Sequence, residues 1–264
     1  MAEKLDKNSV LYWYPKIKDL PIPMPKTVIW RIPKKYYPKI WWEEGIVRKM
    51  LKENEDEIKK TARKVGYPLF LRTDQASGKH GWERTCYVES EDVLLDHAYN
   101  VIEFNMIADL LGLPFKALVF REFIEMDWKF KAFHGNLPIP PERRYFIKDG
   151  KVVEHFPYWI EDAIAKGISR NLPENWRELL AEMNRETEEE VKLLTKYAEM
   201  VAKRIDGYWS IDFCRAKDGT WYLIDMAAGE DSWKPDIKPK SAMEYPDSLK
   251  KVFEKRFGDL KEWF

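Results

Sequence analysis

The stretch from Pro68 to Trp82 constrains the fold most, because a short apolar run opens there into a loop of small residues. The run Leu69 to Leu71 has the length of a buried strand, and the segment Gln75 to Gly81 is too rich in Gly, Ser and Ala to continue it. Glycine lets backbone N–H groups turn toward a ligand, and Arg72 and Lys79 supply the positive charge that phosphates require. The stretch therefore predicts a strand that feeds an anion-binding loop, with a solvated hairpin as the alternative.

The length and the charge balance limit the class of protein. A chain of 264 residues and 31.6 kDa suits one large α/β domain or two tightly joined lobes. Its 45 basic residues balance 45 acidic ones, so no duplex nucleic acid partner is indicated. Cys86 and Cys214 lack metal-ligand spacing and suit small core residues in a reducing cytosol. No apolar stretch approaches the roughly 20 residues that span a bilayer, so we expect a cytoplasmic protein without a membrane segment.

The first 45 residues are crowded with aromatic residues and prolines. The spacing of the prolines argues against a helix through residues 10–45, and Thr27 to Trp30 reads as a short strand. Large aromatic side chains are costly in water, so we expect this lead-in to pack on the core of the domain.

Apolar residues recur at helical spacing in three later segments, among Lys and Glu residues. The first predicted helix ends at Gly66 and Pro68, and Ser90 or Asp92 can cap the second. The predicted helices span residues 46–65, 93–111 and 174–205, and a charged amphipathic helix over 246–264 closes the chain.

Apolar runs and alternating segments between these helices predict strands. Three successive strands with tight turns, followed by the turn residues Asp149 and Gly150, imply an antiparallel sheet. A further hairpin turns at Lys217 to Gly219. The predicted strands span residues 85–89, 115–124, 128–135, 143–148, 208–213 and 220–226.

The last predicted hairpin carries one aspartate on each strand, Asp212 in Ser-Ile-Asp-Phe and Asp225 in Leu-Ile-Asp-Met. A buried aspartate is costly, and two on neighbouring strands repel unless a positive group lies between them. The pattern favours a shared hard cation such as Mg²⁺, held against phosphate oxygens. The alternative places each carboxylate on a backbone N–H group or an arginine. Glu230 follows within reach and could add a ligand.

Three other features offer binding groups. The strand edge from Phe120 to Asp127 can present backbone groups to a purine and an acid to ribose hydroxyls, or can be an ordinary strand with an acidic turn. Arg143 and Arg144 alternate across their strand, so one of them can face the cleft and suit a terminal phosphate. His80 can donate to phosphate or relay protons, or can be a solvated loop residue.

Taken in chain order, these features resemble the ATP-grasp family, from the basic strand and glycine loop to the arginine strand and the two acidic strands. Arg72 stands where the family carries its second nucleotide lysine, which is similar to the branch that makes this replacement. The resemblance implies an α+β fold, in which antiparallel sheets with flanking helices form two lobes around a nucleotide cleft. It divides the chain into a lead-in (1–45), an N-terminal lobe (46–120), a C-terminal lobe with the metal acids (121–240) and a C-terminal helix (241–264).

The resemblance also implies ligands for ATP and Mg²⁺. Asp212 and Asp225 match the metal acids, whereas Ala227 stands where the family has a third ligand, asparagine, so Glu230 or a water would replace it. Arg144 matches the γ-phosphate arginine and Lys79 compensates for the missing lysine, and these two are the implied catalytic groups. The other implied nucleotide contacts are Lys16, Arg72, His80, the hinge residues Glu122, Phe123 and Ile124, and Asp127 at the ribose.

Two classes of function follow from the resemblance. The first is an ADP-forming ligase, in which ATP phosphorylates a carboxylate and an amine displaces phosphate from the acyl phosphate. The second is an ATP-binding assembly factor without ligase turnover, similar to a eukaryotic ATP-grasp relative that helps assemble translation initiation factor 2. The acceptor is a small molecule or a peptide in the first case, and a protein partner is implied in the second. Tyr158 and Trp159 could wall an acceptor pocket or fill the core.

Overall fold

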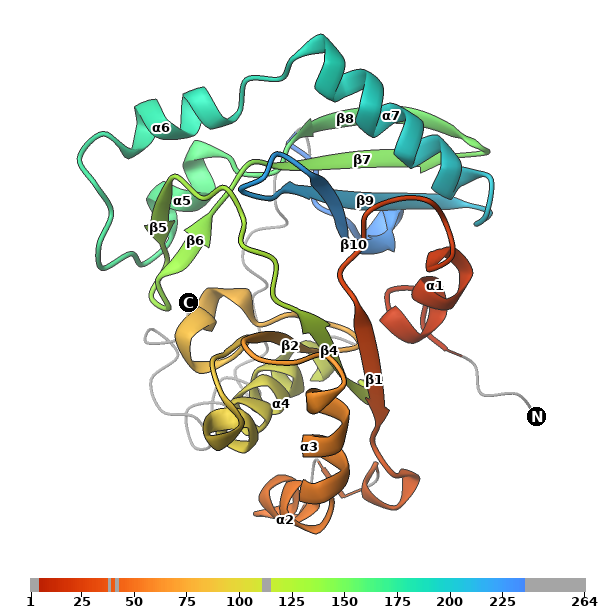
Figure 1. Cartoon of the computed structure of the whole chain (residues 1–264), viewed down its shortest axis with the longest axis vertical. Helices are drawn as coiled ribbons and strands as arrows, with labels where there is room; N and C mark the ends of the chain where they lie inside the picture. The colour runs from red at the N-terminus through yellow and green to blue at the C-terminus, as the bar shows by residue number, and fades with distance from the viewer. Residues whose placement is uncertain (1–4, 38, 41–42, 111–114, 236–264) are drawn as a thin grey trace.

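A computed structural model of the chain describes residues 5–37, 39–40, 43–110 and 115–235, with only the backbone over 107–110. The predicted helix over 246–264, and with it the predicted segment 241–264, lies outside the described residues. The described residues form two four-stranded antiparallel sheets and a two-stranded hairpin, with helices packed on them (Figure 1). The α+β architecture predicted from the sequence is confirmed.

The first sheet lies in the lower half of Figure 1, where helices cover its outer face. Its strand order is β1-β4-β2-β3, and each neighbouring pair is antiparallel. Each strand overlaps a segment that the sequence predicts as a strand. The strands are β1 (Thr27–Arg31), β2 (Leu69–Thr73), β3 (Tyr87–Val88) and β4 (Ala117–Glu122), and the helices are α2 (Ile46–Glu53), α3 (Glu55–Arg63) and α4 (Leu94–Leu110).

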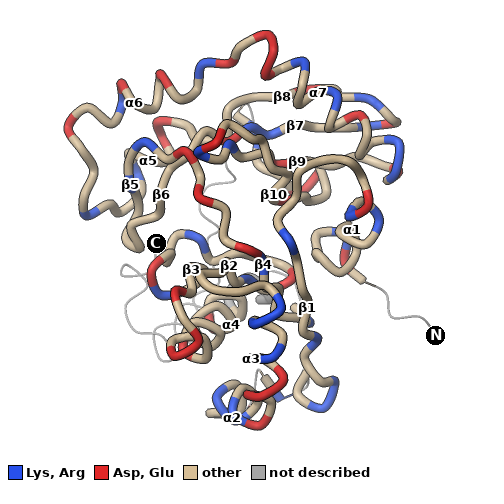
Figure 2. Tube along the Cα trace, in the orientation of Figure 1, with Lys and Arg blue, Asp and Glu red and all other residues tan. Residues whose placement is uncertain are grey.

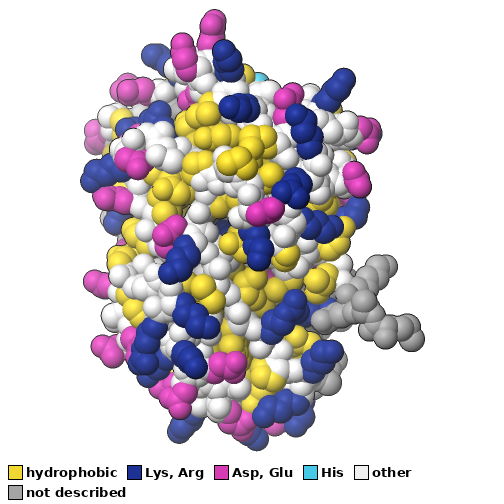
Figure 3. All heavy atoms as spheres, turned by 45° about the vertical axis from the view of Figure 1, so that its right-hand side comes forward, with side chains coloured by type: hydrophobic (Ala, Val, Ile, Leu, Met, Phe, Trp, Pro, Cys, Tyr) yellow, Lys and Arg dark blue, Asp and Glu magenta, His cyan; other side chains and the backbone are white. Residues whose placement is uncertain are grey.

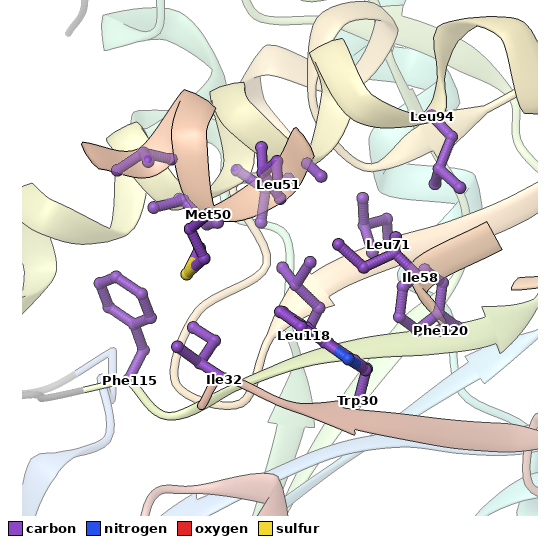
Figure 4. Close-up of a cluster of buried hydrophobic side chains, with 14 of the residues drawn as sticks. Trp30, Ile32, Met50, Leu51, Ile58, Leu71, Leu94, Phe115, Leu118 and Phe120 are labelled. Carbon is purple, nitrogen blue, oxygen red and sulfur yellow. The ribbon is translucent and has the colours of Figure 1, made fainter. Parts of the chain in front are cut away.

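Strand alternation divides the side chains of this sheet between a helix-covered core and the opposite face. Leu69 and Leu71 are fully buried in the core, and Phe70 and Arg72 point to the other face. Burial of one such aliphatic side chain contributes about 1.5 to 3 kcal/mol. Figure 4 shows strand and helix side chains that meet in this core, among them Trp30, Leu71, Leu118, Phe120, Met50, Leu51, Ile58 and Leu94.

The second sheet has the strand order β10-β9-β7-β8 and is antiparallel throughout. The predicted turn between β7 and β8 is confirmed, since Asp149 and Gly150 have the positive φ angles of a two-residue hairpin, 50° and 81°. Helix α7 covers one face of this sheet, and helix α1 joins the same apolar core. The bounds are β7 (Glu142–Lys148), β8 (Lys151–Pro157), β9 (Tyr208–Arg215), β10 (Trp221–Ala228), α1 (Val10–Ile17) and α7 (Glu188–Ala202).

A third apolar cluster holds together a smaller unit, which we call the cap. The cap consists of β5 (Phe130–Ala132), β6 (Leu137–Ile139), α5 (Glu161–Lys166) and α6 (Trp176–Met183). Its β5–β6 hairpin contacts the 3-10 helix η2 (Lys79–Arg84), which follows β2. The cap therefore extends the second sheet toward the loop that follows β2 of the first sheet.

Backbone hydrogen bonds join the cap to η2. Gly135 N donates to His80 O over 3.0 Å, and Glu83 N donates to Gly135 O over 3.3 Å. A Cβ atom at position 135 would lie 2.4 Å from the His80 carbonyl oxygen, so this close approach requires glycine.

The lead-in contains a helix that the proline spacing argued against. Helix α1 includes Pro15, and Ser9 caps its first turn through a side-chain hydrogen bond. Trp13 and Ile17 are buried by this helix in the core of the second sheet. The prediction that no helix runs through residues 10–45 is wrong here, because this burial outweighs one missing backbone donor.

Two predicted long helices are each a pair of shorter helices. The helix predicted over 46–65 breaks at Asn54, and the one predicted over 174–205 breaks before Thr187. The Thr187 side chain accepts a hydrogen bond from Glu190 N over 3.1 Å, in the spacing of a capping box. The predicted three-stranded sheet is also wrong, because β5 pairs with β6 and β7 joins the second sheet.

The outer surface carries charges of both signs. Lys, Arg, Asp and Glu alternate along the outer helices (Figure 2), and on the face drawn in Figure 3 basic side chains lie among acidic ones. None of the helices in the described part of the chain combines the length and the apolar content needed to cross a membrane. Cys86 and Cys214 are both buried, as predicted for small core residues, and burial raises the pKa of Cys86 to about 12.

Candidate functional site

A cavity of about 430 Å³ lies between the two sheets, and residues of both sheets and of the cap line it. Its middle is charged, whereas one end is aromatic. The charged side chains on its wall include Arg72, Lys79, Arg121, Glu142, Arg144, Asp212 and Asp225.

The register of the second sheet places the charged residues on one face. Arg144 on β7 pairs with Asp212 on β9, and Asp212 pairs with Asp225 on β10. The register shifts between Leu223 and Asp225, so β10 carries a bulge next to the second acid. Asp212 and Asp225, which the sequence places on the two strands of one hairpin, are therefore direct cross-strand partners.

The two adjacent arginines of β7 point in opposite directions, as strand alternation predicts. Arg143 points away from the cavity, and its Nε lies 2.6 Å from Glu190 Oε1 on α7. Arg144 points into the cavity, where its Nε and Nη2 donate to the two carboxylate oxygens of Asp212, each over 2.7 Å. The Asp212 charge raises the pKa of Arg144 against the effect of burial. Arg144 and Asp212 therefore form a buried two-pronged ion pair.

The second acid is paired with an arginine from the other sheet. Arg72 Nη1 on β2 lies 2.8 Å from Asp225 Oδ2, and the other Asp225 oxygen accepts from Met226 N over 3.0 Å. Burial favours the neutral acid, but the charges of Arg72 and Arg121 lower the pKa of Asp225. Both acids thus have the arginine partner that the sequence left open as the alternative to a metal.

Lys79 on η2 lies among two aromatic rings and one carboxylate. Its Nζ is 3.4 Å from Glu142 Oε1, 4.2 Å from the centroid of the Tyr158 ring and 4.6 Å from that of Trp159. Burial raises the pKa of Glu142 to about 7, although Lys79 lowers it. Tyr158 and Trp159 line the cavity, and Trp159 also packs in the core of the cap.

The aromatic end of the cavity is built by the first sheet and η2. Trp82 and Tyr87 are stacked with ring centroids 5.7 Å apart, and Tyr87 meets Phe123 edge to face at 5.1 Å. Glu122, Phe123 and Ile124 line this end, and the strand pairing of β4 ends at Glu122. Glu122 N donates to Lys26 O over 2.9 Å, so this hinge group is already bonded to the lead-in.

Four predicted site residues lie off the cavity wall. Lys16 lies on α1 with its Nζ 3.6 Å from the Tyr12 ring centroid, and His80 stacks on Phe133 at 4.3 Å. Glu230 is exposed on the 3-10 helix η4 (Gly229–Asp231). The fourth is the predicted ribose ligand Asp127, whose carboxylate binds Arg215 over 2.6 Å and Lys129 over 2.9 Å. Glu125, two residues before Asp127, lies on the wall.

Several charged residues of the wall had no predicted role, among them Glu142 and Arg121. Glu142 begins the Glu-Arg-Arg run of β7 and shares a face with Arg144, which a spacing of two residues indicates. Arg121 Nη1 donates to Ile224 O, and its Nε is buried without a hydrogen-bond partner in the described part of the protein. Burial, together with the charge of Arg72, lowers the pKa of Arg121 to about 10.

The two aspartates suit Mg²⁺ by the chemistry of their oxygens. A carboxylate offers about four lone-pair positions, and Arg144 uses two of those of Asp212. One Asp225 oxygen binds Arg72 and the other binds Met226 N, which leaves open lone pairs there as well. Within the described segments, no group of three or more His, Cys, Asp or Glu residues could hold a metal on its own. The two acids therefore fit a cation whose other ligands come from phosphate or water.

Comparison with known proteins agrees with the fold. Residues 55–244 match an ATP-grasp domain model, that of family 3 in the clade that carries arginine in place of the second nucleotide lysine. The structure is similar to C-terminally truncated Cdc123 from Schizosaccharomyces pombe, with 18% identity, a TM-score of 0.50 and coverage of 86% of this chain and 87% of that one. No curated protein sequence matches the chain.

Two further structures have lower TM-scores. A D-alanine–D-alanine ligase from Bacillus anthracis complexed with ATP has 14% identity and a TM-score of 0.45, over 84% of this chain and 55% of that one. A RimK domain protein ATP-grasp from Sphaerobacter thermophilus has 13% identity and a TM-score of 0.44, over 85% and 59%. The family match covers most of the chain, and the chain therefore belongs to the ATP-grasp domains, in family 3 of the clade in which arginine replaces lysine.

Proposed function

We propose that this protein binds ATP with Mg²⁺ and uses it to join a carboxylate to an amine through an acyl phosphate. The observation that carries the proposal is one cavity with an aromatic end and a charged middle. An ATP molecule has the same two halves, a flat base and a polyanion, so the cavity matches it in chemistry.

In this proposal the adenine base lies against Tyr87 and Phe123, and backbone groups after Glu122 form hydrogen bonds with its edge. Arg72, Lys79 and Arg144 then face the phosphates, where Arg144 and Lys79 neutralise charge on the transferred group. His80 and Lys16 lie off the wall, so they have no part in this proposal.

Asp212 and Asp225 would hold Mg²⁺, which neutralises phosphate charge when bound. The arginines now paired with these acids are the same groups that we assign to the phosphates. Arg72 and Arg144 would therefore exchange carboxylate for phosphate partners as the nucleotide binds.

The chemistry needs no covalent nucleophile from the protein. A carboxylate oxygen attacks the γ-phosphorus and ADP leaves, and the amine then attacks the acyl carbon and phosphate leaves. The protein contributes alignment and electrostatic stabilisation. A small molecule or a peptide fits as acceptor, and buried, reduced Cys86 and Cys214 fit a cytoplasmic location.

An ATP-binding assembly factor without turnover is the second candidate. It is favoured by the arginine partners of both acids and by Ala227 at the place of the third metal ligand. In that case ATP would stabilise one arrangement of the two lobes for a protein partner.

Calorimetric titration with ATP and ADP at millimolar Mg²⁺ tests the shared part of both candidates, and absence of binding would overturn it. Incubation with ATP and pools of carboxylates, amines and peptides separates the two. ADP release that depends on both acceptors supports the ligase. Tight ATP binding without any such turnover supports the assembly factor.

A further inference from the structure

Tyr158, Trp159 and Glu142 form a site that we call the ammonium cage, and the Lys79 side chain occupies it. The Lys79 Nζ atom lies over both aromatic rings at 4.2 and 4.6 Å and 3.4 Å from the Glu142 carboxylate. Glu142 and Trp159 are each only 3% exposed, so the two groups present a desolvated carboxylate and a desolvated ring. Aromatic faces with an acid are the usual chemistry by which a protein recognises an ammonium group.

The ammonium now in the cage belongs to the loop, not to the cage wall. Lys79 follows Gly78, which has a left-handed φ of 63°, at the start of η2. Glu142, Tyr158 and Trp159 come from β7 and the segment that follows β8. A lysine ammonium stands on a flexible four-carbon stem, so it can move to another anion without displacing the wall.

The cage shares a wall with the phosphate end of the cavity. The Arg144 guanidinium lies 4.6 Å from the centroid of the same Tyr158 ring, and Arg144 binds Asp212. Glu142 and Arg144 are two residues apart on one face of β7. A ligand nitrogen in the cage would therefore be next to the group that we assign to the transferred phosphate.

We propose that the ammonium cage is the binding site of the amine acceptor, that the acceptor is a primary alkylammonium, and that Lys79 fills the cage until nucleotide binds. This proposal rests on the proposed ATP-dependent ligase function. The phosphates of ATP draw Lys79 out of the cage, because a polyanion is a stronger partner than one carboxylate. The amine then enters only when an acyl phosphate can form beside it.

Glu142 then serves as the proton acceptor for this amine. The ammonium gives one proton to a Glu142 oxygen, and the nitrogen lone pair attacks the acyl carbon as the bond from carbon to the phosphate oxygen breaks. The second proton lost from nitrogen goes to the leaving phosphate, and an amide results. Burial raises the pKa of Glu142 to about 7, which suits a base that works near neutral pH.

The test uses n-butylamine as probe and n-butanol as its neutral match, titrated by NMR or calorimetry into the full chain. Lys79→Ala empties the cage, so we expect saturable butylamine binding in the millimolar range and none for butanol. Adding Tyr158→Leu or Glu142→Gln to Lys79→Ala should weaken that binding about tenfold. Lys79→Met removes the same charge but leaves the cage filled, so it should bind no butylamine.

If Lys79→Ala does not fold, butylamine binding to the wild-type protein provides a second test. Butylamine should bind it with a non-hydrolysable ATP analogue present and not without the analogue. No butylamine binding to Lys79→Ala, or equal binding with Glu142→Gln added, would overturn the cage proposal. ATP titration of the wild type distinguishes failure of the cage proposal from failure of the proposed function. ATP binding without amine binding would overturn only the cage proposal. Absence of ATP binding would overturn the proposed function itself.

Discussion

Arg72 on the first sheet and Asp225 on the second form an ion pair across the cavity, with 2.8 Å between Nη1 and Oδ2. The arginine is 3% exposed and the aspartate 33%, so the pair lies partly out of water. It is a direct charged contact between the two sheets, and the Arg144–Asp212 pair lies within the second sheet. The stability of the arrangement of the two sheets should therefore depend on Arg72.

We expect Arg72→Met to lower the free energy of unfolding by about 2 to 3 kcal/mol, because it leaves the Asp225 charge without its partner. Urea denaturation measures this change. A double-mutant cycle with Asp225→Asn should give a coupling of about 1 to 3 kcal/mol. Lys16→Met is the control, and it should change stability by less than about 0.5 kcal/mol. Equal stabilities of Arg72→Met and Lys16→Met would contradict the role of the pair.

Asp225→Asn should weaken binding of ATP in the presence of Mg²⁺ by about tenfold or more, without unfolding the chain. Removal of Mg²⁺ with a chelator should cost the wild type a similar factor and the variant little, because both changes remove the same interaction. Calorimetry with and without chelator measures both. Asp127→Asn is the matched control, because its carboxylate binds Arg215 off the cavity wall. An equal loss of ATP affinity in both variants would refute this assignment.

Tyr87→Ala should weaken ADP binding about tenfold, because base stacking on an aromatic ring contributes about 1 to 3 kcal/mol. Inorganic triphosphate has no base, so its binding should not change. Tyr222→Ala provides the control, since this tyrosine lies on β10 and off the cavity wall. Loss of triphosphate binding in Tyr87→Ala would show that the base does not lie at the aromatic end.

Glu142 should make stability depend on pH. Its pKa in the folded protein is about 7, above the ordinary 4.5, so between these values the folded state holds a proton that the unfolded state has lost. The contribution of Glu142 to the free energy of unfolding therefore falls as pH rises from about 4.5 to 7. Urea denaturation at pH 5, 6, 7 and 8 should show the wild type losing stability relative to Glu142→Gln. A constant difference across that range would contradict the shift.

Gly135→Ala should destabilise the contact between the cap and η2. The added Cβ atom would lie 2.4 Å from His80 O and 2.5 Å from Trp82 N, so the two segments must separate. We expect a loss of about 2 to 3 kcal/mol in the free energy of unfolding. Gly219→Ala has no atom within 4 Å of its Cβ but has a φ of 87°, so it should lose only about 1 kcal/mol. Hydrogen exchange of the backbone amide at position 135, which donates to His80 O in the wild type, should be faster in the variant.

Local patterns predicted the strands and turns well. The hairpin residues Asp149 and Gly150 have the positive φ angles that their turn type demands, and Asp212 and Asp225 are register neighbours. These features depend only on residues close in sequence or on one hairpin. The helix break before Thr187 was not predicted, since we expected one helix over 174–205, although Thr187 and Glu190 have the spacing of a capping box.

Contacts between residues that are distant in the sequence could not be predicted from local patterns. Arg121 reaches the cavity wall through the pairing of β4 with β2, which the sequence does not state. Asp127 lies off the wall because Met126 bridges to Ala216, which brings Asp127 beside Arg215. Helix α1 forms around Pro15 because of burial against distant residues.

The hydrogen bonds between Gly135 and η2 have a mechanical consequence. Since the hairpin of the cap and the segment that carries Lys79 are joined through their backbones, a displacement of one carries the other with it. If nucleotide and acceptor bind as we propose, these backbone hydrogen bonds would link the phosphate side of the cavity to the acceptor side. An acceptor bound against the cap would pull on the nucleotide loop, and a nucleotide would pull on the cap.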